Sequence, residues 1–222
     1  MKIYGIPGLG ADERVYQELN KHLKEKVVPL KWIKPLKNES LNDYLQRFKG
    51  QIDETEKFVL IGVSFGGMVA SELCKHIDPF RTILISSCAT RYELPWFMKM
   101  CSSQLLAIIP AHLLKPPFWV SKIMFGVSDK NYRGLLKQIL ADTEVGFLKW
   151  AMIQILDWKN DERPKRMSRI HGKEDKVLPF PKHQQVFKVN GGHFAIVEQA
   201  AQIAEDIETI LESVPFADPE YE

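Results

Sequence analysis

This chain has few cysteines and no long apolar run, and its first residues do not show the pattern of a secretory leader. Its 3 cysteines are too few for a disulfide scaffold, and Cys74, Cys88 and Cys101 do not form a close-spaced metal motif. No apolar run reaches about 18 residues, so no segment is predicted to span a membrane. Residues 1–5 lack the apolar core of a secretory signal. We therefore expect a protein of the reducing cytoplasm.

The chain also lacks a large excess of charge of either sign. The 30 basic and 28 acidic residues leave a net charge of +2, which gives no electrostatic reason to expect nucleic acid or an anionic membrane as a partner. No internal repeat or low-complexity segment is visible. The 45% apolar content is ordinary for a globular protein, so 222 residues predict one large domain or one domain with an insertion.

One stretch, residues 58–70, organises the rest of the chain. It begins as an unbroken apolar run, which is typical of a strand buried on both faces. It passes through Gly62-Val63-Ser64-Phe65-Gly66 and continues as a helical pattern with no loop between. Strand, Gly-x-Ser-x-Gly and helix are the context of a nucleophile elbow, although the five-residue pattern is weak evidence by itself.

Strands and helices alternate on either side of this stretch. Asp12 and Ser40 are candidate N-caps of two helices, expected over residues 13–23 and 41–52, and a last helix is expected over residues 195–213, ended by Pro215. Alternation of this kind predicts an α/β fold with a parallel sheet. The predicted strands cover residues 2–6, 26–33, 58–63, 82–86, 166–171 and 185–189.

The alternation is interrupted between residues 91 and 162. This segment shows no convincing strand and reads as four or five helices, with breaks at Pro110, Pro116-Pro117, Gly126 and near Asp142. It is rich in aromatic, leucine, isoleucine and methionine side chains, most of which we expect in its own core. We predict a helical cap at 91–162, inserted after the strand at 82–86, with 1–90 and 163–222 forming the α/β core.

A serine nucleophile needs an adjacent base, and two later residues can complete such a site. Asp175 follows a predicted strand in His171-Gly172-x-x-Asp175-x-x-x-Pro179, and His193 follows the last strand in Gly191-Gly192-His193-Phe194. Both would lie at the carboxyl ends of parallel strands, where open α/β sheets build their sites. The order Ser, Asp, His is the one that α/β hydrolases use.

With these motifs the chain resembles the α/β-hydrolase superfamily, in particular its small, cap-bearing members, over nearly its whole length. The resemblance implies that Ser64 is the nucleophile, that His193 is the general base and then acid, and that Asp175 orients the imidazole. It also implies an oxyanion hole built from the backbone N–H groups of Leu9 and Phe65.

Two departures from the family pattern are visible. The family has His-Gly in the oxyanion loop, whereas this chain has Pro7-Gly8. Since backbone groups supply the donors, the missing histidine need not abolish the hole. The chain also begins directly at the strand that leads into this loop. We therefore expect a six-stranded, parallel sheet without the first two, antiparallel strands of the family.

The expected function is a cofactor-independent serine hydrolase that cleaves a carboxylic ester or thioester with a mainly apolar acyl group. Two alternatives stay open: a C–C hydrolase or lyase on the same residues, and a ligand-binding receptor with little turnover. No nucleic acid or membrane span is expected. No sequence feature demands an oligomer, and a homodimer through the cap also stays open.

Two other kinds of site have partial motifs in the sequence. A metal site from His171, Asp175 and His193 matches no zinc spacing. A dinucleotide fingerprint at Gly8-Leu9-Gly10 lacks its third glycine, because Glu13 stands there, and no acid ends the second strand. Neither is expected.

Overall fold

A single six-stranded sheet forms the centre of the computed structural model, which describes residues 1–181 and 186–213. The strand order is β2-β1-β3-β4-β5-β6, and every neighbouring pair is parallel. The predicted α/β class with a parallel sheet is therefore confirmed. The strands are β1 (Lys2–Ile6), β2 (Val27–Pro29), β3 (Phe58–Val63), β4 (Arg81–Ile85), β5 (Met167–Gly172) and β6 (Phe187–Val189).

The apolar run of β3 is buried on both faces of the sheet. Val59, Ile61 and Val63 belong to one apolar cluster, and Phe58 and Leu60 belong to the other. This division follows from the two-residue period of a strand, which sends alternate side chains to opposite faces. A strand without polar positions is stable only where helices cover both faces of its sheet.

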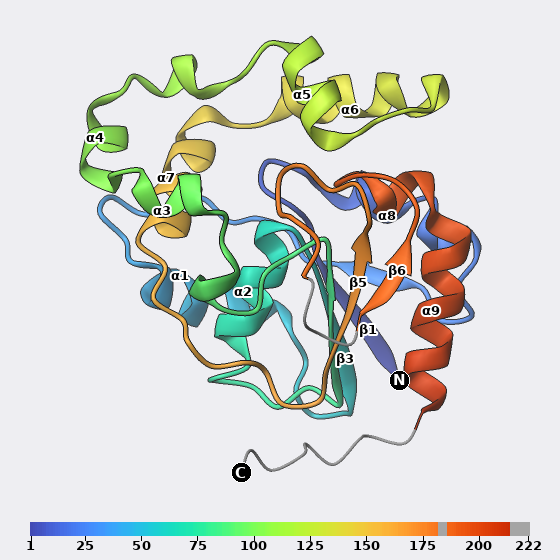
Figure 1. Ribbon diagram of the computed structural model, residues 1–222. Helices are drawn as coiled ribbons and strands as arrows, with labels where there is room; N and C mark the ends of the chain where they lie inside the picture. The colour runs from blue at the N-terminus through green and yellow to red at the C-terminus, as the bar shows by residue number, and fades with distance from the viewer. Residues whose placement is uncertain (182–185, 214–222) are drawn as a thin grey trace.

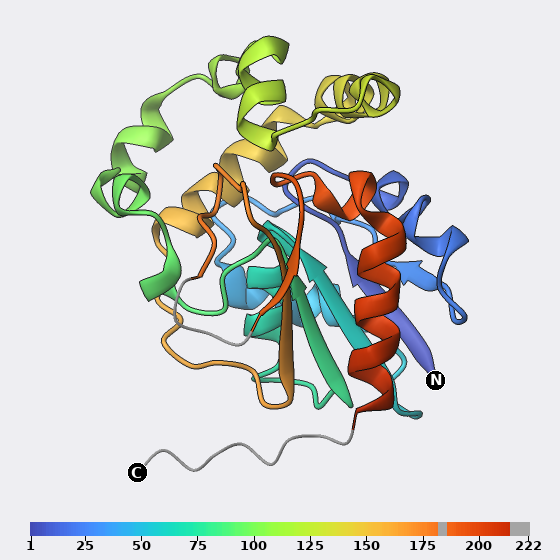
Figure 2. The ribbon, with the colours of Figure 1, turned by 45° about the vertical axis from the view of Figure 1, so that its right-hand side comes forward.

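Helices cover both faces (Figures 1 and 2). α1 (Leu41–Phe48) and α2 (Phe65–Leu73) pack on one face, and α9 (Ala200–Glu212) packs on the other. The prediction that Ser40 is the N-cap residue of α1 is confirmed, because the Ser40 side chain accepts the Asp43 N–H at 3.2 Å. None of the helices among the described residues is long and apolar enough to cross a membrane.

Four predicted elements differ from the structure in type or in boundaries. Residues 13–23 form two 3-10 turns, η1 (Glu13–Tyr16) and η2 (Leu19–Lys21), rather than one α-helix. A spacing of three, as between Tyr16 and Leu19, suits a 3-10 turn as well as an α-helix. Asp12 nevertheless caps η1, since it accepts the Arg14 N–H at 3.1 Å.

The second predicted strand, 26–33, is shorter in the structure. β2 ends at Pro29, and the Leu30 N–H still bonds to the Gly5 carbonyl at 2.8 Å. β2 is an edge strand whose one neighbour, β1, ends at Ile6, so residues beyond Leu30 have no strand to pair with.

The last helix and the helix predicted over residues 41–52 also differ from the prediction in their boundaries. The last helix is divided into α8 (Ala195–Glu198) and α9 at Gln199, whose φ of −119° and ψ of 30° leave the helical region. α1 passes directly into the 3-10 turn η3 (Lys49–Gln51). The predicted start of the last strand at Gln185 and the predicted stop at Pro215 lie outside the described residues.

Residues 91–162, called the inserted segment below, leave β4 and return to β5. The helices end near the predicted breaks: Pro110 follows α4, Pro117 precedes α5, Gly126 ends α5 with a φ of +68°, and α6 ends at Asp142. Figures 1 and 2 show α5 and α6 beyond the carboxyl ends of the strands. The segment contains η4 (Arg91–Glu93), α3 (Trp96–Met100), α4 (Ser103–Ile108), η5 (Ala111–Leu114), α5 (Phe118–Phe125), α6 (Lys130–Asp142) and α7 (Val145–Leu156).

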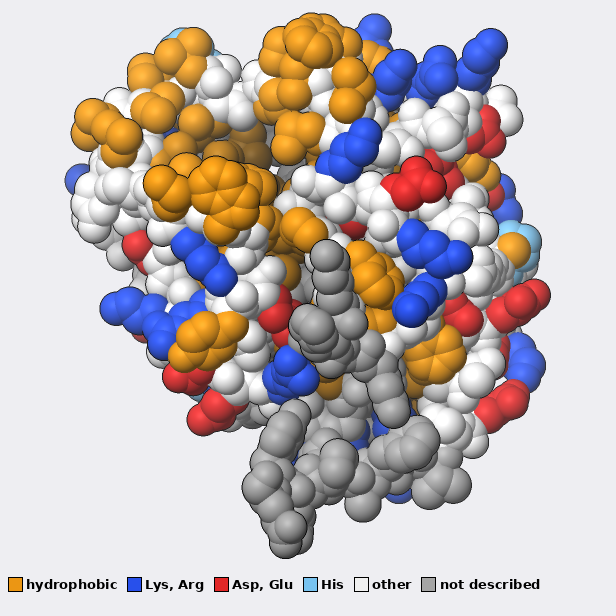
Figure 3. All heavy atoms as spheres, viewed as in Figure 1, with side chains coloured by type: hydrophobic (Ala, Val, Ile, Leu, Met, Phe, Trp, Pro, Cys, Tyr) orange, Lys and Arg blue, Asp and Glu red, His pale blue; other side chains and the backbone are white. Residues whose placement is uncertain are grey.

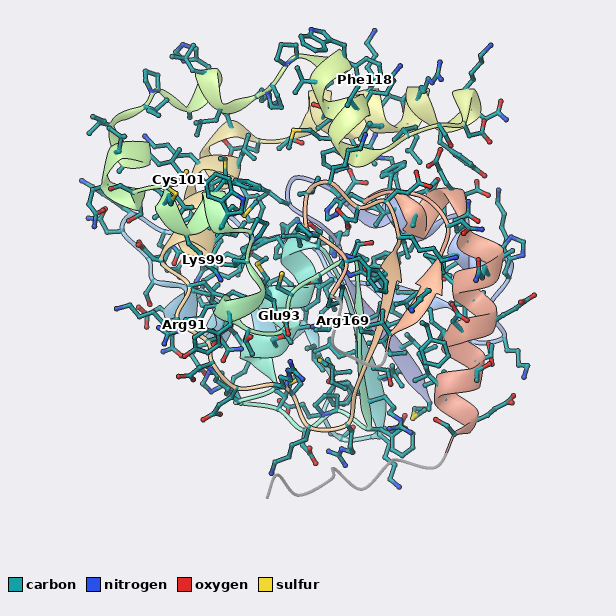
Figure 4. The ribbon with its side chains drawn as sticks, viewed as in Figure 1. Arg91, Glu93, Lys99, Cys101, Phe118 and Arg169 are labelled. Carbon is teal, nitrogen blue, oxygen red and sulfur yellow. The ribbon has the colours of Figure 1, made fainter. Side chains whose placement is uncertain are left out.

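A buried ion pair fixes the start of the inserted segment to the sheet. Arg169 of β5 donates to Glu93 of η4 at 2.7 Å, and the two side chains lie side by side (Figure 4). Glu93 also accepts the Ala89 N–H at 2.8 Å. The prediction that these apolar residues fill the segment's own core is only partly right. Leu106 and Phe147 are buried, but Figure 3 shows many hydrophobic side chains on the surface of this region.

Candidate active site

Ser64 occupies a strained turn between β3 and α2. Its φ of 54° and ψ of −123° lie in a sparsely populated region for a residue with a side chain. Two contacts hold it there: the Ser64 N–H donates to the Ile85 carbonyl at 3.0 Å, and the Ser87 hydroxyl donates to the Ser64 carbonyl at 2.6 Å. A strained serine at a strand-to-helix turn is the geometry of a nucleophile elbow.

The two glycines of the motif allow this turn to pack closely. A Cβ on Gly66 would lie 2.3 Å from the carbonyl oxygens of Ile6 and Pro7, and a Cβ on Gly62 would lie 2.5 Å from the Gly66 oxygen. Those contacts are far inside van der Waals distance and involve backbone, which cannot move aside cheaply. Gly66 therefore brings the elbow against the loop that follows β1.

The three predicted side chains form one hydrogen-bonded series. His193 Nε2 lies 2.8 Å from Ser64 Oγ, and His193 Nδ1 lies 2.7 Å from Asp175 Oδ2. An ionised carboxylate only accepts hydrogen bonds, so Nδ1 carries the proton and Nε2 is free to accept from the serine hydroxyl. Ser64 is half-buried, whereas Asp175 and His193 are buried.

Asp175 is held as a carboxylate. Its Oδ1 accepts the N–H groups of Val177 and Leu178, both at 2.9 Å. Burial by itself raises the pKa of Asp175. Electrostatic attraction from His193 and hydrogen bonds from His171, His193 and the Leu178 N–H outweigh that effect and hold the pKa below its usual range.

His171 contacts the loop that carries Asp175. Its Nε2 donates to the Leu178 carbonyl at 2.9 Å and lies 3.4 Å from Asp175 Oδ2. The ring is buried, and His171 belongs to β5. Among residues 1–181 and 186–213, no group of three His, Cys, Asp or Glu side chains has an arrangement that could hold a metal ion.

The loop after β1 lies against Ser64. A Cβ on Gly8 would be 3.4 Å from the Ser64 Cβ. Within the described part of the chain, the Leu9 N–H has no hydrogen-bond acceptor. Phe65 is the first residue of α2, where N–H groups have no partner inside the helix. Both proposed oxyanion donors are thus free to bind a ligand atom.

Trp32 and Thr143 hold this loop in place. The Trp32 indole N–H donates to the Gly8 carbonyl at 3.2 Å, and the Thr143 hydroxyl lies within hydrogen-bond distance of two carbonyls, Gly10 at 2.9 Å and Ile139 at 2.8 Å. Thr143 lies between α6 and α7, so the inserted segment contributes directly to the position of the loop that carries Leu9.

The inserted segment also contacts the loop of His193. The Phe125 ring meets the His193 ring edge-on, with centroids 5.4 Å apart. Just beyond it, Gly126 and Gly192 approach so closely that a Cβ on Gly192 would lie 2.8 Å from the Gly126 Cα. The absence of side chains at both positions therefore lets the end of α5 rest on the Gly-Gly-His loop.

A carboxylate secures this contact. Glu198 of α8 accepts the N–H groups of Ser128 at 2.9 Å and Asp129 at 2.7 Å, and the Ser128 hydroxyl at 3.2 Å. Sequence reasoning did not identify Ser87, Trp32, Phe125 or Glu198 as supports of the site. Their partners lie between 23 and 70 residues away in sequence, and none belongs to a local motif.

Residues 6–206 match the alpha/beta hydrolase family, and the chain belongs to it. No curated protein sequence matches the chain.

Three solved structures illustrate the likeness in fold. The enol-lactonase from Burkholderia xenovorans has a TM-score of 0.74 at 14% identity, covering 96% of this chain and 92% of that one. An esterase from Exiguobacterium antarcticum has a TM-score of 0.73 at 14% identity, with the same coverage. A thermophilic esterase from Thermogutta terrifontis, with malate bound, has a TM-score of 0.70 at 15% identity, covering 95% and 89%. They support the α/β-hydrolase fold.

Proposed function

We propose that this protein is a cofactor-independent serine hydrolase that cleaves a carboxylic ester or thioester with a mainly apolar acyl group. The observation that carries the proposal is the continuous series Ser64–His193–Asp175, with bonds of 2.8 and 2.7 Å. A hydroxyl is a weak nucleophile until a base takes its proton, and His193 Nε2 is in position to do so.

The reaction follows from this geometry in two halves. Ser64 Oγ attacks the acyl carbon as its proton passes to His193 Nε2, and His193 then returns that proton to the departing alcohol or thiol. Water next attacks the acyl-enzyme in the same way and releases the acid. Asp175, an ionised carboxylate, stabilises the imidazolium formed in each half.

The negative charge that develops on the carbonyl oxygen would be stabilised by the N–H groups of Leu9 and Phe65. Removal of one such donor costs about 10²–10³ in rate in other acyl-transfer enzymes. Pro7 in place of the family's histidine does not change the number of donors, because both are backbone groups. Trp32 and Thr143 keep the loop in position.

Aromatic side chains near the serine support an apolar acyl group. Phe125 covers one side of His193, and Trp32 packs against Phe65 and Phe147, with centroid distances of 5.6 and 5.0 Å. Phe125 and Phe147 both come from the inserted segment, which in this proposal acts as the cap over the site. Two of the structural neighbours above are named esterases and one an enol-lactonase, which favours ester chemistry.

The test combines a fluorophosphonate probe with aryl esters and thioesters of graded acyl length. We expect covalent labelling and turnover that disappear in Ser64→Ala and persist in Ser102→Ala, an exposed serine of the inserted segment. Turnover should be greatest on medium or long acyl chains and unaffected by dialysis against a chelator.

Labelling without turnover on every ester and thioester would contradict the hydrolase proposal and favour the receptor or lyase alternatives. Fastest turnover of short, highly polar esters would contradict the apolar acyl group alone. Loss of activity after chelation would overturn cofactor independence.

A further inference from the structure

The outer surface of α3, α4 and α5 carries an unusual concentration of exposed apolar side chains. Trp96, Ile108 and Trp119 are 73%, 76% and 66% exposed, respectively. Figure 3 shows such side chains gathered over these three helices around a hollowed region. We call this surface the apolar face and define it by Trp96, Met100, Leu105, Ile108, Trp119 and Ile123. An exposed patch of this kind on a globular protein marks an interaction site.

The same part of the chain is strongly basic. Residues 94–141 contain six of the 30 basic residues and one of the 28 acidic residues. The one acid, Asp129, caps α6 by accepting the Asn131 N–H at 2.8 Å. Figure 3 shows a row of basic side chains over α6, beside the apolar side chains of α5. The basic residues are Lys99, Lys115, Lys122, Lys130, Arg133 and Lys137.

We propose that the apolar face docks on an anionic lipid surface. Tryptophan and aliphatic side chains insert at the boundary between headgroups and acyl chains, while lysines extend their charged ends toward anionic headgroups. Each basic residue near such a surface adds to the attraction. α3, α4 and α5 are 5, 6 and 8 residues long, so they suit lying in the interface and are too short to span it.

The charge pattern favours lipid over a second copy of this chain. A two-fold interface places the same patch of each subunit against the other. Here that would bring lysines toward lysines, with no acidic residue between 94 and 128 to pair with them. An anionic bilayer supplies the missing counter-charge, whereas a second apolar face does not.

Docking in this way would place the candidate site at the lipid surface. α5 contributes Trp119 and Ile123 to the apolar face, and its last residue, Phe125, contacts His193. One helix of two turns thus joins the docking face to the candidate base. This inference goes beyond the proposed hydrolysis and does not depend on it, because binding can be measured without turnover.

Vesicle flotation tests the proposal with the full chain. We expect binding to vesicles of phosphatidylcholine mixed with one third phosphatidylglycerol, weak binding to phosphatidylcholine alone, and loss of binding at high salt. Trp96→Gln with Trp119→Gln, and separately Lys122→Glu with Lys130→Glu, should each weaken binding at least about tenfold. The matched control, Leu36→Gln with Lys31→Glu, changes an exposed leucine and lysine elsewhere and should bind as the unaltered protein does.

Thermal unfolding shows whether each variant folds. If one double variant fails to fold, vesicle binding by the other double variant tests the proposal. Equal binding to both kinds of vesicle, no binding to either, or equal loss in the Leu36→Gln, Lys31→Glu control would overturn the proposal. So would a dimer in solution that dissociates in the Trp96→Gln, Trp119→Gln variant, because the second copy would then cover the face.

Discussion

The sheet core and the inserted segment use their apolar side chains in opposite ways. In β3 every side chain is buried, and both faces of the sheet are closed by helices. In α3, by contrast, no residue is buried, and α5 buries only Ser121. A core that closes on itself fixes the positions of Ser64, Asp175 and His193. The inserted segment leaves apolar surface exposed, which the proposed docking on lipid would cover.

The two regions nevertheless meet at two loops of the site. Thr143 bonds to the loop of Leu9, and Phe125 and Gly126 rest on the loop of His193. The inserted segment therefore restrains two of the loops that carry candidate site residues.

The largest effect is expected from Asp175→Asn in the core. Loss of the carboxylate removes the acceptor that fixes the His193 tautomer, and activity should fall about 10⁴-fold. The same variant tests stability against pH. Because the pKa of Asp175 is lowered on folding, its stabilising contribution is fully present above the ordinary value of 3.8 and is lost as pH falls below it.

Unfolding in urea at neutral and acid pH measures this contribution. The unaltered protein should lose more free energy of unfolding between neutral pH and about pH 3 than Asp175→Asn loses. An equal loss in both proteins would show that Asp175 is not held ionised by the fold.

Two glycine substitutions, one in each region, should change the free energy of unfolding in opposite directions. Gly66→Ala places a methyl group 2.3 Å from two backbone oxygens and should lower the free energy of unfolding by about 1–3 kcal/mol or more. Gly134→Ala lies in α6 with open space around its Cβ and should raise it by up to about 1 kcal/mol. Urea denaturation of both variants checks the pair, and destabilisation by Gly134→Ala would mean that α6 is less regular than described.

A smaller effect is expected where the regions join. Glu198→Ala removes the acceptor of the Ser128 and Asp129 N–H groups, so the end of α5 should move more freely over the His193 loop. We expect kcat/KM to fall several-fold, with faster proteolysis between α5 and α6. Glu205→Ala, an exposed glutamate of α9, is the control. Equal kinetics in the two variants would show that the site holds its geometry without this anchor.

The smallest expected effect is a difference in reactivity among the three cysteine thiols. Burial raises the pKa of Cys88 to about 12 and that of Cys74 to about 11, whereas Cys101 lies exposed beside the apolar face. A thiol-disulfide reagent at mildly alkaline pH should therefore titrate one thiol rapidly in the folded protein and three after denaturation. Rapid reaction of two or three thiols in the folded state would show that the core opens readily.

The sequence by itself determined the elements whose signals are local. The apolar run of β3, the Gly-x-Ser-x-Gly turn and the proline and glycine breaks in the inserted segment all depend on backbone preferences that neighbouring residues share. The order of Ser64, Asp175 and His193 after separate strands also predicted their meeting, because parallel strands end at one edge of a sheet. The spacing did not determine the type of every element: the helix predicted over residues 13–23 is two 3-10 turns, since both geometries satisfy the same spacing.

Only the tertiary structure decided which residues support the site and which surface is left open. Ser87, Trp32, Phe125 and Glu198 act through partners distant in sequence, and no spacing rule connects them. The same holds for the apolar face. Hydrophobic periodicity predicts that a side chain prefers burial, but it cannot tell whether another part of the chain will cover it. In the core, helices cover both faces of the sheet. Over the apolar face of α3, α4 and α5, no element of the described chain covers the exposed side chains.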